Sequence, residues 1–475
     1  TASLNKFHQP AGLGRDENPI ECAARKLYTF LGFGALPLLV GHLLWRGFRQ
    51  PAYRQHWAER FLGLARASEL PVGVAFGEVP NRQVLWIHAV SVGETRAAMP
   101  LVIRWLEKGE NFRVVLTHTT PTGRETGADI FSRWRSSNSA GRDPLIQRYL
   151  PYDFPWANSA FLSWASPTLG VLMETELWPN LLAQAQRRDI AVVLINARLS
   201  PRSARRLSQF SWLARPAVAR LTGIAAQTES DAQGFLRMGD STPRVEVVGN
   251  MKFDVEIPKE SAHLGERWRT VFPGRRIWLA ASTRDDEEAE ILGAWKRARS
   301  GQQIESRDLL VIVPRHPQRF ERVARLISDA GLISLRRQAL DTITQDRSTN
   351  AIEVLLGDSL GDMFAYLCFS DLVLMGGSIP ALGGQNPIEA CAVGRPVFFG
   401  PNMFNFQQIA RLLRESGAGC EVSNYGEWIT RGIVLLGDSQ ALEQRSQASR
   451  EFARHHRGAT SRTDEFLTTI LRAGH

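Results

Sequence analysis

Cysteine is scarce in this chain of 475 residues, which contains four: Cys22, Cys368, Cys391 and Cys420. They lie far apart and match neither a disulfide framework nor the spacing of metal ligands. This usage fits a reduced, cytoplasmic setting. Asp-x-Asp and His-Glu-x-x-His motifs are also missing, so the sequence predicts no metal and no other cofactor.

Fingerprints of several nucleotide- and nucleic-acid-binding classes are absent as well. No Gly-x-Gly-x-x-Gly follows the first strand-like run, which argues against a dinucleotide oxidoreductase. No Gly-x-x-x-x-Gly-Lys-Ser/Thr occurs, which excludes a P-loop NTPase. Without a zinc-finger spacing, an RNP motif or a stripe of basic and aromatic residues, the net charge of +9 does not indicate nucleic acid. It instead predicts an anionic membrane surface or an acidic substrate.

Apolar runs typical of buried parallel strands recur along the chain, with helical patterns between them. This alternation predicts βαβ units, and the length favours two domains. We therefore expect an α/β protein with two doubly wound, Rossmann-like domains that face a cleft, 51–250 and 251–475. The expected strands are 84–90, 113–117, 169–174, 191–196, 223–227, 245–249, 277–282, 309–314, 352–357, 372–376 and 396–399.

An apolar stretch flanked by basic residues stands near the start of the chain. Residues 27–45 are at the lower length limit for spanning a bilayer, and Pro37 and His42 weaken a spanning helix. We expect segment 25–50 to associate with the membrane, with its cations on anionic headgroups. A buried core helix is the alternative. The polar tail, residues 1–24, is expected to be disordered.

The most informative stretch of the sequence follows the expected strand 372–376. Gly376 and Gly377 open a glycine-rich loop, after which Asn386 is a suitable helix N-cap and Glu389 completes a capping pattern. Glycines let a backbone approach a ligand closely, and helix N-termini attract anions. This unit either binds an anion such as a nucleotide phosphate or is capped for stability alone.

A second strand–loop–helix unit lies three hundred residues earlier. The expected strand 84–90 is followed by Ser91, Gly93 and Glu94. Ser91 and Glu94 form a capping-box pattern. A carboxylate at the carboxyl end of a strand in an open α/β sheet also faces the ligand site, where it can act as a general base. Both interpretations of Glu94 stay open at this point.

Further polar residues follow expected strands in the first half of the chain. Glu174 and Glu176 either hold sugar hydroxyls by charge-assisted hydrogen bonds or complement a helix dipole. Thr120 contacts a phosphate or sugar, or only caps a helix. Lys252, near the expected domain boundary, is a candidate to neutralise an anionic substrate.

The second half offers phosphate-binding candidates at two further strand ends. The hydroxyls of Ser282 and Thr283 suit a phosphate. Arg315 and His316 stand between two prolines that fix the backbone, a fairly specific arrangement for an anion site.

Together these motifs resemble the bacterial 3-deoxy-D-manno-octulosonic acid (Kdo) transferases of lipopolysaccharide assembly. The resemblance extends from about Leu27 to about Arg414. The motifs that carry it are 88–94, 149–153, 173–180, 196–200, 252–254, 314–317, 376–378, 386–389 and 405–406.

The resemblance implies a two-domain glycosyltransferase of the GT-B type on the cytoplasmic face of the inner membrane of a Gram-negative bacterium. Such an enzyme transfers Kdo from CMP-Kdo to the glucosamine 6-hydroxyl of a tetra-acylated lipid A precursor, with inversion. Its partners are then CMP-Kdo, the lipid A precursor and anionic inner-membrane lipids. A sugar-nucleotide epimerase of the same fold and a non-catalytic protein that binds an acidic glycolipid are the alternatives.

The resemblance also assigns roles to residues. Glu94 matches the proposed catalytic base of the family, and two positions depart from the pattern, because many relatives have histidine in place of Arg284 and Gln385. The implied donor-binding residues are Ser282, Thr283, Arg315, His316, Gly376, Gly377, Ser378, Asn386 and Glu389. The implied contacts of the acceptor or of Kdo are Ser91, Gly93, Thr120, Glu174, Glu176 and Lys252.

Overall fold

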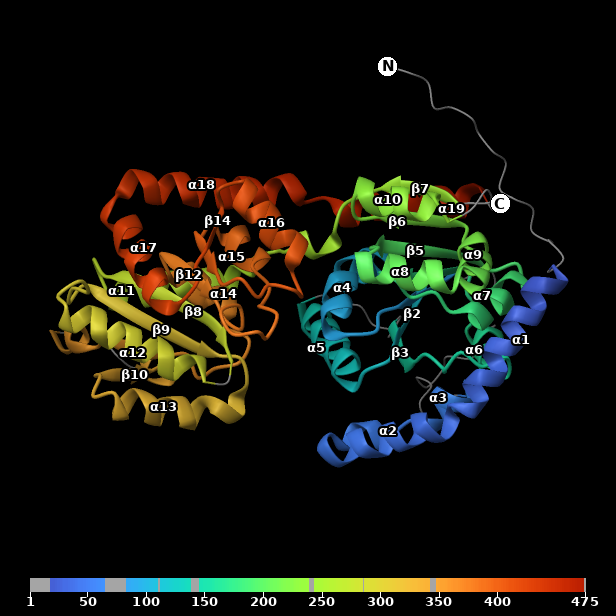
Figure 1. Cartoon of the computed structure of the whole chain (residues 1–475), viewed down its shortest axis with the longest axis horizontal. Helices are drawn as coiled ribbons and strands as arrows, with labels where there is room; N and C mark the ends of the chain where they lie inside the picture. The colour runs from blue at the N-terminus through green and yellow to red at the C-terminus, as the bar shows by residue number, and fades with distance from the viewer. Residues whose placement is uncertain are drawn as a thin grey trace, which may run out of the picture. The chain divides into compact units, whose positions relative to one another are not determined.

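The chain divides into two compact units in the computed structural model (Figure 1). Unit 1 comprises Thr1–Asp254 and Gly458–His475, and unit 2 comprises Val255–Arg457. The structure describes residues 18–64, 83–109, 112–137, 145–238, 243–284, 286–341 and 347–473.

Unit 1 is built on a seven-stranded parallel sheet with the strand order β3-β2-β1-β4-β5-β6-β7. Four adjacent inner strands, β2, β1, β4 and β5, read as nearly continuous apolar runs because both faces of the sheet are covered. The strands are β1 Gln83–His88, β2 Phe112–His118, β3 Leu145–Tyr149, β4 Leu169–Met173, β5 Ala191–Ala197, β6 Gly223–Ala226 and β7 Arg244–Val247.

Helices cover both faces of this sheet. One hydrophobic cluster joins it to α4 and α19, and a second, on the opposite face, joins it to α6, α7 and α9. The helices of unit 1 beyond the N-terminal segment are α4 Val92–Glu107, α5 Pro121–Ser137, α6 Pro155–Ala165, α7 Pro179–Gln186, α8 Pro201–Gln209, α9 Ser211–Ala219, α10 Glu229–Leu236 and α19 Ala459–Ala473, with the 3₁₀ turn Met251–Phe253.

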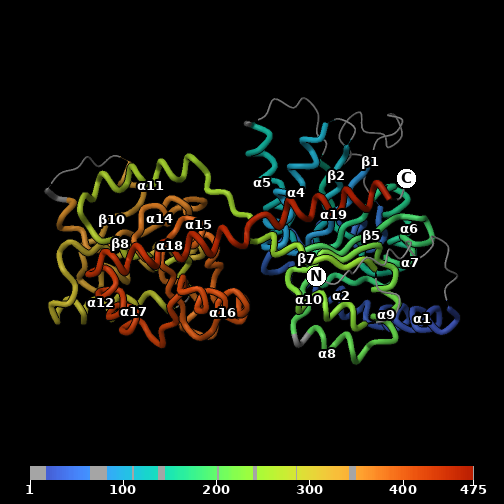
Figure 2. Tube along the Cα trace, turned by 90° about the horizontal axis from the view of Figure 1, so that it is seen from above, coloured from blue at the N-terminus to red at the C-terminus, as the bar shows by residue number. Residues whose placement is uncertain are grey.

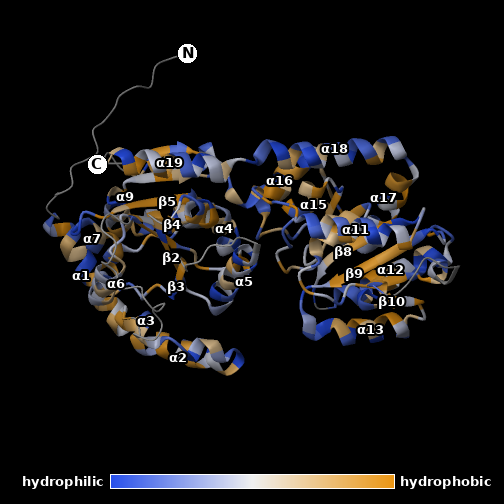
Figure 3. Ribbon diagram, turned by 180° about the vertical axis from the view of Figure 1, so that it is seen from behind, coloured by the Kyte–Doolittle hydropathy of each residue, from blue (hydrophilic) through white to orange (hydrophobic). Residues whose placement is uncertain are grey.

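Unit 2 repeats the architecture with a second seven-stranded parallel sheet, in the order β10-β11-β9-β8-β12-β13-β14. Three buried tryptophans, Trp278, Trp295 and Trp428, pack edge to face at its centre, with ring centroids 5.5 and 5.7 Å apart. Strands of both sheets, β5 and β9 among them, are strongly hydrophobic (Figure 3). The strands are β8 Arg276–Thr283, β9 Asp308–Pro314, β10 Ser334–Arg336, β11 Val354–Leu356, β12 Leu372–Met375, β13 Val397–Phe399 and β14 Gly419–Glu421.

The helices of unit 2 flank its sheet in the same doubly wound manner (Figure 2). They are α11 Lys259–Val271, α12 Glu287–Ser300, α13 Phe320–Asp329, α14 Met363–Phe369, α15 Ile388–Val393, α16 Gln407–Glu415, α17 Tyr425–Gly437 and α18 Ser439–His456.

The N-terminal segment folds as two helices, α1 Pro19–Gly34 and α2 Leu36–Arg49, followed by a 3₁₀ turn and the short helix α3 Trp57–Leu62. Within the described residues no single helix has the length and apolar character to cross a membrane. The pair α1 and α2, bent by 49° at the break between them, meets both requirements together. Large apolar side chains on the pair are exposed, Phe30 by 73% and Phe48 by 79%, which rules out the core-helix alternative.

The expected α/β architecture with two doubly wound sheets is confirmed, and the eleven expected strands are present. Three further strands were missed, β3, β10 and β14, and all three lie at sheet edges. Edge strands are short or partly polar: Gln147 and Arg148 interrupt the apolar run of β3, and β10 and β14 have three residues each.

Two expected boundaries differ from the structure. The expected disordered tail, residues 1–24, overlaps α1, because the Asn18 side chain accepts a hydrogen bond from Ile20 N–H at 3.1 Å and Pro19 occupies the first turn. Residues 1–17 lie outside the described part of the chain. The C-terminal residues expected in the second domain return to unit 1, where Phe466, Leu467 and Ile470 of α19 enter its core.

We predict that Leu467→Ala destabilises unit 1 by about 2–5 kcal/mol, because it leaves a cavity at a fully buried position. Hydrogen–deuterium exchange followed by mass spectrometry measures the effect peptide by peptide. Peptides from β5 and β6 should lose protection while those from β8 and β9 keep it. Leu360→Ala, at a site 71% exposed in unit 2, is the matched control. Loss of protection confined to unit 2 would contradict the placement of α19.

Candidate active site

The expected acceptor-side residues of unit 1 gather at the carboxyl ends of three neighbouring strands. β2, β1 and β4 are adjacent and parallel, so the segments that follow them start from one edge of the sheet. Glu94 comes from the first turn of α4 after β1, Thr120 from the turn after β2, and Glu174 from the residue that follows β4. Lys252, in the 3₁₀ turn after β7, reaches the same edge through Glu174.

Glu94 is a largely buried carboxylate, 9% exposed, held in a capping arrangement. Its Oε2 accepts a hydrogen bond from Val90 N–H at 3.0 Å, and its Oε1 accepts one from the Ser91 hydroxyl at 2.9 Å. The Ser91 hydroxyl in turn accepts from Glu94 N–H at 3.4 Å, which caps α4. The capping pattern expected from the sequence is confirmed, and it fixes the orientation of the carboxylate.

The surroundings of Glu94 disfavour its charge. Its pKa is raised to about 7, first by burial, then by the negative charge of Glu174 and, to a smaller extent, by that of Glu176. The hydrogen bonds from Val90 N–H and the Ser91 hydroxyl oppose this rise without cancelling it. Near neutral pH the carboxylate therefore changes its protonation state readily, as a general base or acid requires.

Glu174 and Glu176 form the rest of the acidic cluster. Glu174 has a left-handed backbone (φ 58°), a strained conformation for a residue other than glycine, and its Oε1 accepts from Lys252 Nζ at 2.6 Å. Glu176 accepts from Trp178 Nε1 at 2.7 Å, and burial raises its pKa. The expected set of Glu94, Glu174, Glu176 and Lys252 is thus brought together.

Thr120 and Gly93 complete the rim of this cluster. The Thr120 hydroxyl donates to Val90 carbonyl at 3.0 Å and accepts from Gly123 N–H at 3.2 Å, so it ties the β2–α5 turn to the Glu94 loop. Gly93 is exposed, and a Cβ atom built on it would meet only the Ser91 hydroxyl, at 4.0 Å. Gly93 therefore borders open space beside Glu94.

Two buried histidines lie beneath the cluster. Burial lowers the pKa of His88 to about 3 and that of His118 to about 4. Both are therefore neutral at physiological pH and cannot offset the acidic side chains. The positive charge that the structure places against this acidic cluster comes instead from Lys252.

Asn196, near the end of β5, was not among the expected site residues. It has a left-handed backbone (φ 48°), and its Oδ1 accepts from Met251 N–H at 3.0 Å. This bond holds the turn that carries Lys252. The signal that could have found it is an asparagine at the end of an apolar strand, a residue type suited to positive φ.

The expected donor-side residues of unit 2 also converge at the ends of neighbouring strands. β9, β8 and β12 are adjacent and parallel. Arg315 N–H donates to Thr283 carbonyl at 2.9 Å, and Gly376 N–H donates to Ala281 carbonyl at 2.8 Å. A Cβ atom on Gly376 would lie 2.3 Å from Ser282 carbonyl oxygen, so only glycine fits there.

Glu287, at the start of α12, organises this loop and was not expected to. Its Oε2 accepts from Arg284 N–H at 2.7 Å and from Gly377 N–H at 2.6 Å, and its Oε1 accepts from the Tyr425 hydroxyl at 3.0 Å. Burial raises its pKa. The N–H groups of Arg284 and Gly377 are therefore bound to a carboxylate and are not free to bind phosphate.

Other expected donor contacts divide into buried and accessible side chains. Ser378 is buried and bonds to Met375 carbonyl, and Thr283 is buried and donates to Glu288 at 2.7 Å. Arg315 and His316 have exposed side chains, and Ser282 and Glu389 are partly exposed.

The helix after the glycine-rich loop begins later than expected. α15 begins at Ile388 rather than at Pro387, yet Asn386 Oδ1 still accepts from Ile388 N–H at 3.2 Å. The two positions that depart from the family pattern lie together, since a Cβ atom on Gly377 would be 3.3 Å from Arg284 Cγ and 3.6 Å from Gln385 Nε2.

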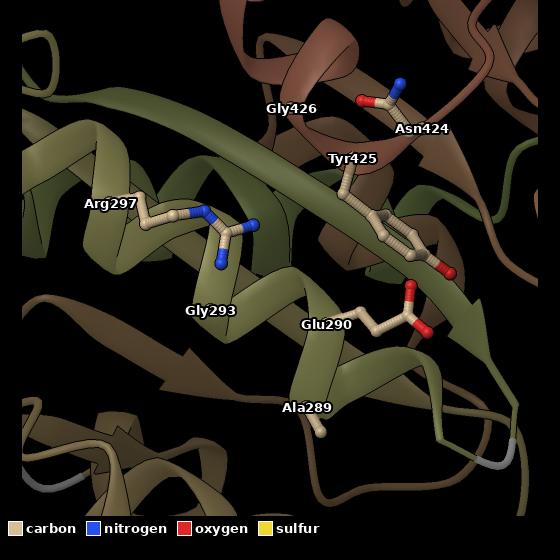
Figure 4. A pocket seen from close by; sticks show the side chains of 7 residues that line it. All are labelled: Ala289, Glu290, Gly293, Arg297, Asn424, Tyr425 and Gly426. Carbon is tan, nitrogen blue, oxygen red and sulfur yellow. The ribbon is translucent and has the colours of Figure 1, made fainter.

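A separate hollow of about 600 Å³ lies between α12 and the start of α17 (Figure 4). It is lined by Glu290, Arg297 and Tyr425, among others, and by none of the expected donor residues. Among the residues that the structure describes, no group of three or more His, Cys, Asp or Glu side chains is placed to hold a metal ion.

The fold of this protein is shared with solved structures of a known structural class. UDP-GlcNAc 2-epimerase from Neisseria meningitidis, solved with UDP-GlcNAc, superposes on 82% of this chain and 100% of its own with a TM-score of 0.53 at 15% identity. UGT2 from Phytolacca americana, solved with UDP-2-fluoroglucose and pterostilbene, covers 83% of this chain and 99% of its own, with a TM-score of 0.50 at 13% identity. The protein has the GT-B fold that glycosyltransferases and epimerases share.

Sequence relatives distinguish between these classes. Residues 55–255 match the family model described as 3-deoxy-D-manno-octulosonic-acid transferase (kdotransferase). The 3-deoxy-D-manno-octulosonic acid transferase of Bordetella pertussis is 37% identical over 447 residues, which cover 94% of this chain and 99% of the relative. That of Haemophilus influenzae is 33% identical over 449 residues, with the same two coverages. This chain belongs to the Kdo transferase family and is a glycosyltransferase of lipopolysaccharide biosynthesis.

We predict that Glu94 titrates with a midpoint of about 7 in the intact protein. Nuclear magnetic resonance of ¹³C-labelled glutamate measures this, with the resonance assigned by its loss in Glu94→Gln. Glu174→Gln should lower the midpoint because it removes a negative charge, and Glu176→Gln should lower it less. A midpoint near about 4, the value of an ordinary glutamate, in all three proteins would contradict this account of the site.

Proposed function

We propose that this protein transfers Kdo from CMP-Kdo to the glucosamine 6-hydroxyl of a tetra-acylated lipid A precursor, with inversion at the anomeric carbon and with Glu94 as general base. Membership of the Kdo transferase family supports the reaction class. The observation that supports the residue is the oriented, largely buried Glu94 carboxylate at a strand end, with a pKa raised to about 7.

The proposed step is a single displacement. The acceptor hydroxyl loses its proton to a Glu94 carboxylate oxygen, and its oxygen forms a bond to the anomeric carbon of Kdo. The bond from that carbon to the phosphate oxygen breaks, and CMP leaves with the bonding electron pair. A base whose pKa lies near the working pH combines sufficient basicity with a sufficient population of the ionised form.

The other acceptor-side residues position the sugars. Glu174 and Glu176 accept hydrogen bonds from sugar hydroxyls, and Lys252, now paired with Glu174, neutralises an anionic group of a bound substrate. Ser91 and Thr120 hold the loop around Glu94, and Gly93 leaves room for a sugar ring beside it. Their common origin at one sheet edge supports this assignment.

The donor-side residues act on the leaving group. The exposed side chains of Arg315 and His316 bind the phosphate of CMP, where preorganised positive charge stabilises the charge that develops as the bond breaks. Ser282, Gly376, Gly377, Asn386 and Glu389 shape the loop around the nucleotide. Thr283 and Ser378 support that loop from within, since their hydroxyls are buried and bonded to protein atoms.

The N-terminal helix pair holds the enzyme on the anionic inner membrane. Exposed apolar side chains on α1 and α2, including Phe30, Leu38 and Phe48, offer a surface for insertion. Arginines accompany the aromatic residues at the end of α2: the guanidinium of Arg46 lies 4.5 Å from the Tyr53 ring centroid, and that of Arg49 lies 4.9 Å from the Trp45 ring centroid. This arrangement suits the boundary between acyl chains and anionic headgroups.

Glu94→Gln tests the catalytic role. Removing the base while keeping the shape of the side chain should lower kcat by roughly 10²–10⁴-fold. The affinity for CMP, measured by calorimetry, should stay within a few-fold of wild type, because the nucleotide is bound by unit 2. Glu107→Gln, an exposed glutamate on the same helix, is the matched control. Wild-type turnover in Glu94→Gln would show that Glu94 only caps α4.

Charge reversal at Arg46, Arg49 and Arg54 tests the membrane assignment. Replacing all three with glutamate should weaken binding to vesicles that contain anionic lipid, as measured by flotation, and raised salt should weaken the binding of the wild type. A triple reversal at Arg297, Arg325 and Arg454, exposed positions in unit 2, gives the same change in net charge. Equal loss of binding in both variants would contradict a specific role for the N-terminal pair.

A further inference from the structure

A polar cluster joins the N-terminal helix α1 to the start of α7. Three of its side chains are more than nine-tenths buried, namely Arg25, Asn158 and Asn180. Because buried polar groups are stable only when they are hydrogen-bonded, such a cluster fixes the relative positions of the elements that supply it. The α1–α7 cluster, as we term it, comprises Arg25, Tyr28, Thr29, Asp153, Asn158 and Asn180.

Asp153, from the loop between β3 and α6, caps α7 although it is far from that helix in sequence. The residue that precedes this helix, Trp178, supplies no side-chain cap. Instead Asp153 Oδ2 accepts from Asn180 N–H at 3.0 Å and Oδ1 accepts from Leu181 N–H at 2.9 Å, and Asn158 Nδ2 donates to Oδ1 at 2.7 Å. The position of the first turn of α7 therefore depends on this carboxylate.

The side chains of α1 complete the cluster. Asn180 Nδ2 donates to Thr29 Oγ1 at 2.9 Å, and Asn180 Oδ1 accepts from Arg25 Nη1 at 3.2 Å. The Tyr28 hydroxyl donates to Asp153. Figures 1 and 3 both show α1 beside α7. Through its hydrogen bonds with Arg25 and Thr29, the buried Asn180 links the proposed membrane helix to the chain that follows β4.

That chain leads directly into the acidic cluster. We term residues 174–178 the acceptor loop. This loop carries Glu174 and Glu176 and ends directly before the first residue of α7. Trp178 donates to Glu176 at 2.7 Å, and its ring packs edge to face against His88, with 5.8 Å between centroids. Because Pro179 restricts the backbone between Trp178 and Asn180, a shift of Asn180 displaces the acceptor loop.

We propose that α1 is a positioning element for the acceptor loop as well as a membrane-associated helix. In this proposal Asn180 and Asp153 transmit the placement of α1 to Glu174 and Glu176. The inference deepens the proposed function, since it rests on the role of Glu94 and its acidic neighbours in transfer.

The sharpest test changes one atom on α1. Thr29→Val keeps the shape of the side chain and removes the hydroxyl that bonds to Asn180, and Thr29→Ser restores that hydroxyl. Glu21→Gln is the control on the same helix, because it weakens only the contact with Arg220, 3.2 Å away at the other end of α1. Asn180→Ala is the second, larger change, and it removes the link itself.

Turnover of all variants is measured across pH in detergent micelles, together with vesicle binding. Thr29→Val and Asn180→Ala should lower kcat roughly tenfold or more, because small displacements at a reaction centre are costly. The pH limb governed by Glu94 should move to lower pH, because a loosened acceptor loop leaves Glu94 better hydrated and farther from Glu174 and Glu176. Thr29→Ser and Glu21→Gln should resemble wild type, and vesicle binding should be unchanged throughout.

Wild-type kcat and pH profile in both Thr29→Val and Asn180→Ala, with folded protein, would overturn the inference and leave α1 as an anchor alone. Loss of activity in strict proportion to vesicle binding would overturn it too. Failure of the proposed function is distinguishable, because there Glu94→Gln would keep its activity whatever the Thr29 variants do.

Discussion

The parallel alignment of neighbouring strands is the constraint on which both candidate sites depend. In each sheet three adjacent strands run in one direction, so the loops that follow them begin at one edge, although they are far apart in sequence. In unit 1 this brings Glu94 and Glu174 together, and in unit 2 it brings Thr283, Arg315 and Gly376 together. Both sheets are covered by helices on two faces, which leaves these edges for the chemistry that we propose.

Burial gives the first of these edges the property that the proposed proton transfer requires. A carboxylate exposed to water would be too weak a base near neutral pH, whereas the position of Glu94, in the first turn of α4 and close to other acids, raises its pKa to about 7. The same hydrogen bonds that cap the helix orient the carboxylate. Capping and catalysis, which the sequence presents as alternatives, are therefore compatible in one side chain. At the edge in unit 2 a carboxylate has a structural role instead, because Glu287 accepts hydrogen bonds from two loop N–H groups and holds them in place.

The sequence predicted the architecture well, because long apolar runs and glycine-rich turns are local signals. It missed β3, β10 and β14, since edge strands need no continuous apolar run, and it assigned α19 to the wrong unit, since the return of a helix across a domain boundary has no local signature. Contacts between segments that are distant in sequence could not be predicted either. That Asp153 caps α7, or that Glu287 binds Gly377 N–H, follows only from the folded chain. The motifs were enough to name the candidate residues. They could not show which N–H groups and hydroxyls of these residues are already bound to other protein atoms.

The reaction that we propose for this protein is the transfer of Kdo from a nucleotide to a glycolipid. It is tested most directly by measuring CMP release from CMP-Kdo by the purified protein in detergent, with and without a tetra-acylated lipid A precursor, together with the mass of the lipid. We expect CMP to be released only when the acceptor is present, and the lipid to gain the mass of one or more Kdo units. Equal release of CMP without the acceptor, or a lipid of unchanged mass, would contradict it.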